Sequence, residues 1–211
     1  MTLNEELKTI QDSRGKDYVD PFNDSIQKKG ELIYPNPGES APMFELLNEK
    51  GEPVKLENIL KQGPVILSFF KGDFCQLCDL ELKTLQRSLP QFTKHGAILL
   101  GISPHTVSIS YQLKEKKELS YSILSDQGNQ IAEIYGLRFK IQPMLMEAFA
   151  SFGLADLRPL FGDSGENTNT LPIPGTFVIG MDEKIAFAFV DSDHTKRAEP
   201  SDIIACLMSL Y

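Results

Sequence analysis

Residues 65–82 read VILSFF followed by KGDFCQLCDLEL, and this stretch decides the fold. The run 65–70 is almost entirely apolar, with β-branched and aromatic residues, as in a central strand buried on both faces. Apolar residues then recur at spacings of four and three, which is typical of the inward face of a helix. They are Cys78, Leu82, Leu85, Leu89 and Phe92. The pattern predicts a strand, a short turn and a helix that begins near residue 76.

Two cysteines lie where the turn meets this helix, at Cys75 and Cys78. Backbone N–H groups in the first turn of a helix lack partners within the helix, so they stabilise a thiolate and lower its pKa. Lys71 adds positive charge nearby, whereas three acidic residues between positions 73 and 81 oppose it. The direction of the net pKa shift therefore stays open. We expect two sulfurs that are close enough to bond and accessible enough to react.

A Cys-x-x-Cys pair has three interpretations. Zinc binding needs about four ligands, and Cys206 and the histidines at 95, 105 and 194 show no paired ligand spacing. Two inert core cysteines with this spacing are the second interpretation. Redox chemistry fits best, because the strand, the turn and the helix all match what such a motif requires. Three cysteines in 211 residues also make no disulfide scaffold.

Composition and charge exclude several classes of protein. The net charge is −8 and the pI is about 5.0, which argues against nucleic acid or an anionic membrane surface as a partner. No apolar run approaches the ~20 residues that a membrane span requires, and the start of the chain lacks the apolar core of a signal peptide. We therefore expect a cytoplasmic protein.

The chain is expected to form one domain with an N-terminal appendage. Apolar residues from Leu3 to Ile10 have the spacing of an amphipathic helix, and a break is expected near Pro21. The cluster PNPG at 35–38 marks the start of the main domain. We assign 1–34 to a helical extension and 35–211 to the redox domain. The extension either packs on the main domain or mediates formation of a homodimer.

Apolar runs and turn residues predict the elements that follow the cysteine helix. Residues 97–103 form a second buried strand, 106–118 a surface helix, and 176–179 with 184–190 a hairpin, while Pro200 opens the last helix. Strands and helices alternate in the first half, and the hairpin and a helix complete the chain. This order is typical of an α/β fold of the thioredoxin-like kind, a central mixed sheet flanked by helices.

The chain resembles the alkyl hydroperoxide reductase/thiol-specific antioxidant (AhpC/TSA) family, in particular its peroxiredoxin-like branch. KGDFCQLCDLEL at 71–82 is similar to that branch's motif, Arg-Gly-x-Trp-Cys-Pro-Tyr-Cys-x-x-Glu-Leu. Further similar segments extend the resemblance over nearly the whole chain. They are Gly38–Phe44, Ser125–Gly128, Tyr135–Leu137, Phe187–Asp191 and Asp193–Pro200.

The resemblance implies peroxide chemistry. Peroxiredoxins have the pattern Pro-x-x-x-Thr-x-x-Cys, which places Cys78 at the attacking cysteine, Cys75 at the threonine and Lys71 at the proline. Glu81 matches a glutamate often found three residues after the attacking cysteine. Cys78 would become a sulfenic acid, Cys75 would condense with it, and an external thiol would reduce the disulfide. The implied substrates are hydrogen peroxide or organic hydroperoxides, the implied electron donor is a thioredoxin or glutathione system, and no cofactor is implied.

Two departures from the family pattern keep other hypotheses open. Peroxiredoxins carry an arginine before the late strand, where this chain has Pro174, and Arg138 or Arg197 is the candidate replacement. Cys75 also replaces the threonine hydroxyl that contacts the peroxide. Both changes favour a thioredoxin-type thiol–disulfide oxidoreductase, in which Cys75 attacks and Cys78 resolves. A catalytically silent binding module of the same fold is the third hypothesis.

Four residues are expected to bind the substrate or partner: Lys71, Phe74, Pro174 and Arg197. Thioredoxin-like folds place a cis-proline before the late strand, against the reactive cysteine, and Pro174 is the candidate here. Phe74, together with the phenylalanines at 70 and 177, is expected to wall an apolar pocket around the thiols.

The remaining cysteine and histidines have less specific expectations. His194 and Asp193 either join the site or form a hydrogen-bonded loop pair. His95 and His105 are expected at the surface. Cys206 is expected as a small core residue of the last helix, or else as a remote resolving cysteine.

Overall fold

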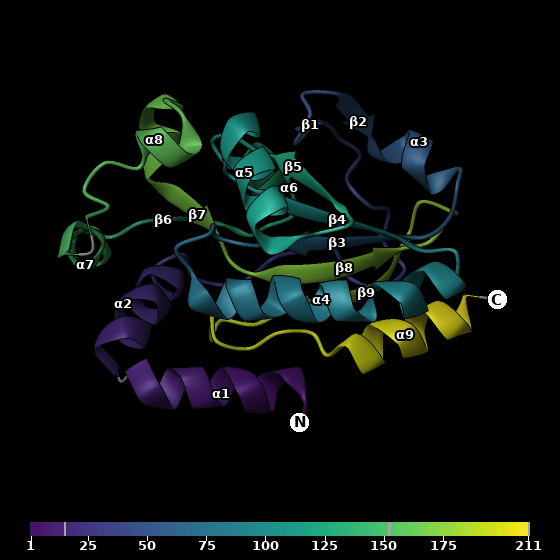
Figure 1. Cartoon of the computed structure of the whole chain (residues 1–211), viewed down its shortest axis with the longest axis horizontal. Coiled ribbons are helices and arrows are strands. Elements are labelled where there is room, and N and C mark those ends of the chain that lie inside the picture. The colour runs from purple at the N-terminus through teal and green to yellow at the C-terminus, as the bar shows by residue number, and fades with distance from the viewer. Residues whose placement is uncertain (15, 152, 211) are drawn as a thin grey trace.

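The computed structural model describes residues 1–14, 16–151 and 153–210. Within these residues, seven strands form one mixed sheet in the order β2-β1-β5-β4-β3-β8-β9 (Figure 1). The strands are β1 (Glu45–Asn48), β2 (Pro53–Lys55), β3 (Val65–Phe69), β4 (Ile98–Ser103), β5 (Ser122–Ser125), β8 (Gly175–Ile179) and β9 (Ile185–Val190). β3 lies inside the sheet, parallel to β4 and antiparallel to β8. The expected central mixed sheet is confirmed.

Helices cover both faces of the sheet (Figure 1). The longest helix of the described chain, α4, runs along the sheet and packs against α1 and α9. The helices are α1 (Leu3–Arg14), α2 (Lys16–Gln27), α3 (Leu56–Leu60), α4 (Gln76–Lys94), α5 (Val107–Lys117), α6 (Gln130–Ile134), α7 (Pro143–Ser151), α8 (Arg158–Phe161) and α9 (Pro200–Ser209). None of the helices in the described residues is long and apolar enough to cross a membrane.

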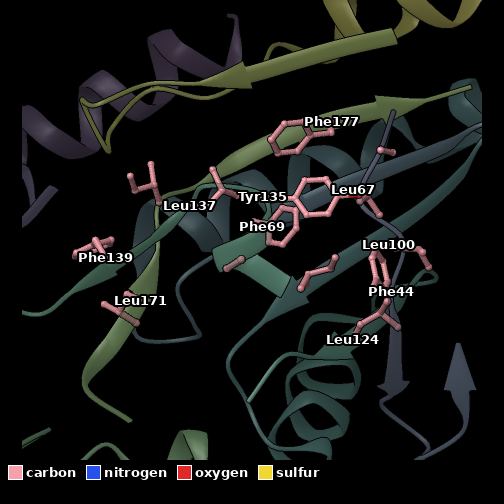
Figure 2. Close-up of a cluster of buried hydrophobic side chains, with 14 of the residues drawn as sticks. Phe44, Leu67, Phe69, Leu100, Leu124, Tyr135, Leu137, Phe139, Leu171 and Phe177 are labelled. Carbon is pink, nitrogen blue, oxygen red and sulfur yellow. The ribbon is translucent and has the colours of Figure 1, made fainter. Parts of the chain in front are cut away.

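The central strand divides the core into two apolar clusters. All five residues of β3 are buried, as its almost entirely apolar sequence predicts. Because side chains alternate along a strand, Ile66 and Phe70 join the cluster that contains both thiols. Leu67 and Phe69 join the opposite cluster, where Figure 2 shows them near Phe177. The cysteines therefore lie on the α4 side of the sheet.

The N-terminal extension forms two helices rather than one helix broken at Pro21. Pro21 lies inside α2, so the expected break at that residue is wrong. A proline inside a helix costs about 3 kcal/mol, and the burial of Phe22 and Ile26 on the inner face of α2 offsets that cost. Leu3 and Leu7 of α1 are buried in the cluster that holds the thiols.

Several short elements have no counterpart in the sequence-based expectations. They are β2, α3, α8, the 3₁₀ helix Gly165–Asn169, and the small antiparallel sheet of β6 (Arg138–Lys140) and β7 (Thr170–Pro172). Elements of three to five residues are too short for a hydrophobic period to be recognised. The β6–β7 pair matters for the site because it leads the chain into Gly175, the first residue of β8.

Candidate active site

The thiols lie where β3 ends and α4 begins, as the motif predicts. Cys75 is the N-cap residue of α4, and its Sγ accepts the backbone N–H of Cys78 at 3.2 Å. Cys78 lies in the first turn and faces the core. The two sulfurs therefore meet at the positive end of a helix, where unpartnered N–H groups favour a negative charge.

A glycine makes the tight turn before the thiols possible. Gly72 has φ +148°, a conformation that other residues rarely adopt. A Cβ at this position would lie 2.7 Å from the Phe74 ring and 3.0 Å from His105 Nε2. The chain between Lys71 and Cys75 thus turns sharply against these two rings.

Both thiols are fully buried, so the expectation of an accessible pair is wrong for this closed structure. Neither cysteine forms a disulfide bond. Both pack in one apolar cluster with Leu77, Leu82 and Leu3 in the first turn of α1. Apolar packing on the inner face of α4 explains the burial, since Cys78 lies on the stripe that points into the core. A small reagent reaches these sulfurs more easily than a protein disulfide does.

The Arg197 guanidinium contacts Cys78. Its Nη2 lies 3.6 Å from Cys78 Sγ, and its Nε donates to the Glu81 carboxylate at 2.5 Å. Nη1 donates to two carbonyl oxygens of its own loop, those of His194 and Lys196, each at 2.7 Å. With all these contacts inside the protein, the guanidinium is held in one orientation.

Arg138, the other candidate for the missing arginine, lies elsewhere. Its Nε pairs with Glu133 at 2.9 Å, and its Nη1 donates to the Gly128 carbonyl at 3.4 Å. Of the two candidates, the fold brings only Arg197 to the thiols.

Lys71 is a second buried cation beside the pair. Its Nζ lies 2.8 Å from His194 Nδ1 and 3.7 Å from the centre of the Phe22 ring. Burial lowers the pKa of the Lys71 ammonium, while the charges of the two thiols oppose this shift. His194, for which the sequence left a role in the site open, is therefore part of this cluster, whereas Asp193 accepts from Thr195 within its own loop.

The pKa values of the two thiols are shifted in opposite directions. Burial raises the pKa of Cys75, but the hydrogen bond with Cys78 and the charges of Lys71 and Arg197 outweigh it and lower the pKa to about 6. Burial and the hydrogen bond with Cys75 raise the pKa of Cys78. The pair therefore loses its first proton easily, with the charge on Cys75, and holds its second proton tightly.

The buried carboxylate beside the thiols has a shifted pKa as well. Burial raises the pKa of Glu81 to about 7, although the Arg197 guanidinium opposes the shift. The same ion pair raises the pKa of Arg197, against the effect of its burial. Arg197 therefore stays a cation, and Glu81 fixes its direction.

Aromatic side chains line one flank of the site. The Phe74 ring packs edge-on against the Phe149 ring, with 5.3 Å between the ring centres, and its centre lies 6.3 Å from that of the Phe161 ring. His105 lies 5.7 Å from Phe161 and is fully buried, so the expectation of a surface histidine is wrong here. It follows the buried strand β4, and its Nε2 lies 3.4 Å from both the backbone N and Oδ1 of Asp73. His95, by contrast, is half-buried.

Phe177 and Pro174, two residues expected at the site, differ from their predicted arrangement. Phe177 belongs to the core on the opposite face of the sheet, with Tyr135 and Phe69 (Figure 2), because its position in β8 points away from α4. Pro174 is buried, but its peptide bond is trans, so the expected cis-proline is wrong. The Ile173 N–H donates to the Leu137 carbonyl at 2.8 Å, so the β6–β7 pairing continues to the residue before Pro174. X–Pro bonds in folded proteins are mostly trans.

Cys206 lies on the last helix, apart from the start of α4. Cys206 of α9 is half-buried against the thiol-containing cluster, and burial raises its pKa. In the described part of the chain, no group of three or more potential ligands is arranged to hold a metal ion.

The low first pKa of the pair makes a testable prediction. A thiolate with a pKa of about 6 is present above that pH and is lost as the pH falls through it, whereas a free cysteine ionises near ~8.5. The ultraviolet thiolate absorbance of Cys206→Ser, which leaves only the pair, should therefore titrate with a midpoint of about 6. A single midpoint in the range of a free cysteine would contradict the assigned electrostatics.

Comparisons with known proteins agree with this geometry. The AhpC/TSA family model matches residues 37–188. A putative peroxiredoxin bcp of Coxiella burnetii is 35% identical over 100 residues, 47% of this chain and 66% of that protein. The chloroplastic peroxiredoxin Q of Arabidopsis thaliana is 32% identical over 120 residues, 57% of this chain and 55% of that protein. The matches thus span between half and two thirds of these relatives.

Solved structures share the fold at low sequence identity. Peroxidoxin BcpB from Mycobacterium tuberculosis has a TM-score of 0.64 at 21% identity and covers 84% of this chain and 99% of its own. The reduced 2-Cys peroxiredoxin of Plasmodium vivax has a TM-score of 0.62 at 19% identity. The match covers 84% of this chain and 82% of that chain. The expected thioredoxin-like arrangement is thereby confirmed.

Proposed function

Because the chain belongs to the AhpC/TSA family, we propose that it is a thiol-dependent peroxidase that cycles Cys75 and Cys78 between dithiol and disulfide. The observation that carries the proposal is the Arg197 guanidinium, 3.6 Å from Cys78 Sγ and fixed by Glu81. A preorganised cation stabilises the negative charge that develops on a peroxide oxygen as the O–O bond breaks. Cys75 has no comparable contact with a guanidinium among the hydrogen bonds of the site.

The proposed reaction begins with a proton transfer within the pair. Cys75 carries the thiolate charge, and the Cys78 thiol donates its hydrogen bond to it. When that proton passes to Cys75, the Cys78 thiolate attacks the terminal peroxide oxygen and the O–O bond breaks. The departing alkoxide, or hydroxide when the substrate is hydrogen peroxide, takes a proton from water. Cys78 is then a sulfenic acid. The Cys75 thiol attacks its sulfur, water leaves, and a disulfide forms.

An external thiol completes the proposed cycle. Two equivalents of thiol reduce the disulfide and are themselves oxidised to a disulfide. A thioredoxin or glutathione system supplies such electrons, and a reducing compartment such as the cytoplasm suits a dithiol that must be regenerated after each turnover. A homodimer formed through the extension stays a prediction.

The depressed pKa of Cys75 at the N-cap favours a second function, a thiol–disulfide oxidoreductase. In that chemistry Cys75 attacks a disulfide of a protein. The complete burial of both sulfurs opposes it, because a protein disulfide needs far more room than a peroxide. The buried cations also oppose a silent binding module, since buried charges are costly and a module without chemistry gains nothing from them.

The two enzymatic functions are separated by one pair of assays. We expect hydrogen peroxide to be consumed in a coupled thioredoxin and thioredoxin reductase assay, and insulin disulfides to be reduced no faster than by dithiothreitol alone. Cys206→Ser is the matched control and should retain full peroxidase activity, because this half-buried cysteine lies on α9 and not at the start of α4, which carries the pair. Insulin reduction without peroxide consumption would reverse the assignment.

A further inference from the structure

The loop at 193–197 carries two residues of the cluster around the thiols. Arg197 reaches Cys78 and Glu81, and His194 reaches Lys71. This loop lies outside the residues that the family model matches, and so does the helical extension. The two segments meet on the α4 side of the sheet, where α1 lies beside α4 (Figure 1).

Asn4 of α1 holds the Arg197 end of the loop. Its Oδ1 accepts the backbone N–H of Arg197 at 3.0 Å, and its Nδ2 donates to the Arg197 carbonyl at 2.9 Å. Nδ2 also donates to Glu199 at 2.7 Å. The Glu199 carboxylate in turn accepts the backbone N–H groups of Leu3 and Asn4, at 2.9 and 2.8 Å, and so caps the start of α1.

Asn23 of α2 holds the His194 end of the loop. Its Oδ1 accepts the backbone N–H of His194 at 3.2 Å. The neighbouring Phe22 ring lies 4.7 Å from the His194 ring and 3.7 Å from Lys71 Nζ. The helices α1 and α2 therefore each contribute one asparagine to one end of the same loop.

We propose that Asn4 and Asn23 are positioning residues of the active site, which hold the 193–197 loop so that Arg197 contacts Cys78 and His194 contacts Lys71. The proposal rests on the function proposed above. It makes the N-terminal extension a working part of the site and not only a cover of the core.

The hydrogen bonds of Arg197 explain how a backbone contact sets the direction of a side chain. Nη1 binds the carbonyl oxygens of His194 and Lys196, which belong to the loop itself. When the loop moves, these acceptors move with it and the guanidinium turns relative to Cys78. A displacement of about 1 Å is enough to lose up to about a hundredfold in rate when a reacting group depends on geometry.

The test compares Asn4→Ala, Asn23→Ala and the double variant, each in a Cys206→Ser background that leaves only the pair. Two quantities are measured: the midpoint of the ultraviolet thiolate titration, and the rate constant for oxidation by hydrogen peroxide. The hydrogen bond with Cys78 and the charges of Lys71 and Arg197 lower the first pKa of the pair. Glu81 and His194 contact those two cations. We expect the midpoint of Asn4→Ala to rise by about one pH unit and its rate to fall about tenfold, with a smaller effect in Asn23→Ala.

Three further variants separate positioning from general stability. Asn4→Asp keeps the shape of the side chain but loses both N–H donors and faces Glu199 with a second negative charge, so it should behave like Asn4→Ala or worse. Thr9→Ala, on the exposed face of the same helix, should match the parent. Leu60→Ala removes a core side chain of the opposite cluster and should lower the melting temperature without moving the midpoint.

The outcomes decide the proposal independently of the activity. An unchanged midpoint in Asn4→Ala and Asn4→Asp, or an equal shift in Leu60→Ala, would overturn it. If the parent consumes no peroxide, the proposed function fails, whereas the thiolate midpoints still show whether the asparagines set the electrostatics of the pair.

Discussion

Cys78→Ser should abolish peroxide reduction, with a loss of about 10³-fold or more, because the attacking sulfur is gone. A serine hydroxyl at this position stays protonated and cannot displace the peroxide oxygen. Cys75→Ser should behave differently. It keeps Cys78 beside Arg197, and serine is a good N-cap residue, so α4 should begin as before. This variant should complete one slower oxidation and then stop at the sulfenic acid.

Each variant is treated with one equivalent of hydrogen peroxide and then with dimedone, and mass spectrometry identifies the labelled cysteine. Steady-state peroxide turnover is measured in parallel. We expect a sulfenic acid adduct on Cys78 in Cys75→Ser, no adduct in Cys78→Ser, and no turnover in either. The opposite result, an adduct on Cys75 in Cys78→Ser and an inert Cys75→Ser, would exchange the roles of the two sulfurs. It would also favour the oxidoreductase chemistry that the low pKa of Cys75 permits.

Arg197→Ala should have the second-largest effect, and it should lower both activity and stability. The rate constant with peroxide should fall about 10²–10³-fold, the loss typical of one electrostatic donor in an active site. Stability should fall by about 3–5 kcal/mol, because the variant leaves Glu81 buried without the partner of its ion pair. Arg197→Lys keeps the charge but cannot reach Glu81, the loop carbonyls and Cys78 together, so we expect a partial loss of rate.

A double variant separates the two effects of Arg197. Glu81→Leu with Arg197→Met replaces the buried ion pair by apolar side chains of similar size, and such replacements are often neutral for stability. We expect its melting temperature to recover toward that of the parent while the peroxidase activity stays low. Arg158→Ala removes an arginine from an exposed ion pair with Asp156 and is the matched control, without effect on either quantity. Full activity in the double variant would remove Arg197 from the mechanism.

These predictions share one physical basis, the burial of charged groups around two sulfurs. Lys71, Glu81 and Arg197 are all buried, although such residues are rarely buried unless they are paired. The charges of these groups and of the neighbouring thiolate have opposite signs and stabilise one another. Removing one member leaves its neighbours with uncompensated charge in a region that water does not reach. Changes in this cluster should therefore affect stability and thiol ionisation together.

Local spacing predicted the parts of this protein that depend on neighbours in the chain. The apolar run of β3, the stripe of α4 and the pair at its start follow from repeating patterns within about twenty residues. The prediction that the pair is a redox centre followed from the same strand, turn and helix. The N-cap position of Cys75 agreed with the expectation because helix ends have simple local rules.

Tertiary structure alone decided which residues surround the thiols. Arg197 and Cys78 are 119 positions apart, and Lys71 and His194 are 123 apart. No period connects such residues, because the order of strands in the sheet and the path of one loop bring them together. The same holds for Phe177, which the strand register turns to the opposite face, and for His105, which the fold buries. Hydrogen bonds between near neighbours and the spacing of apolar residues determine the helices and strands, and both can be recognised in the sequence. Burial and charge pairing at the site depend on the complete tertiary structure.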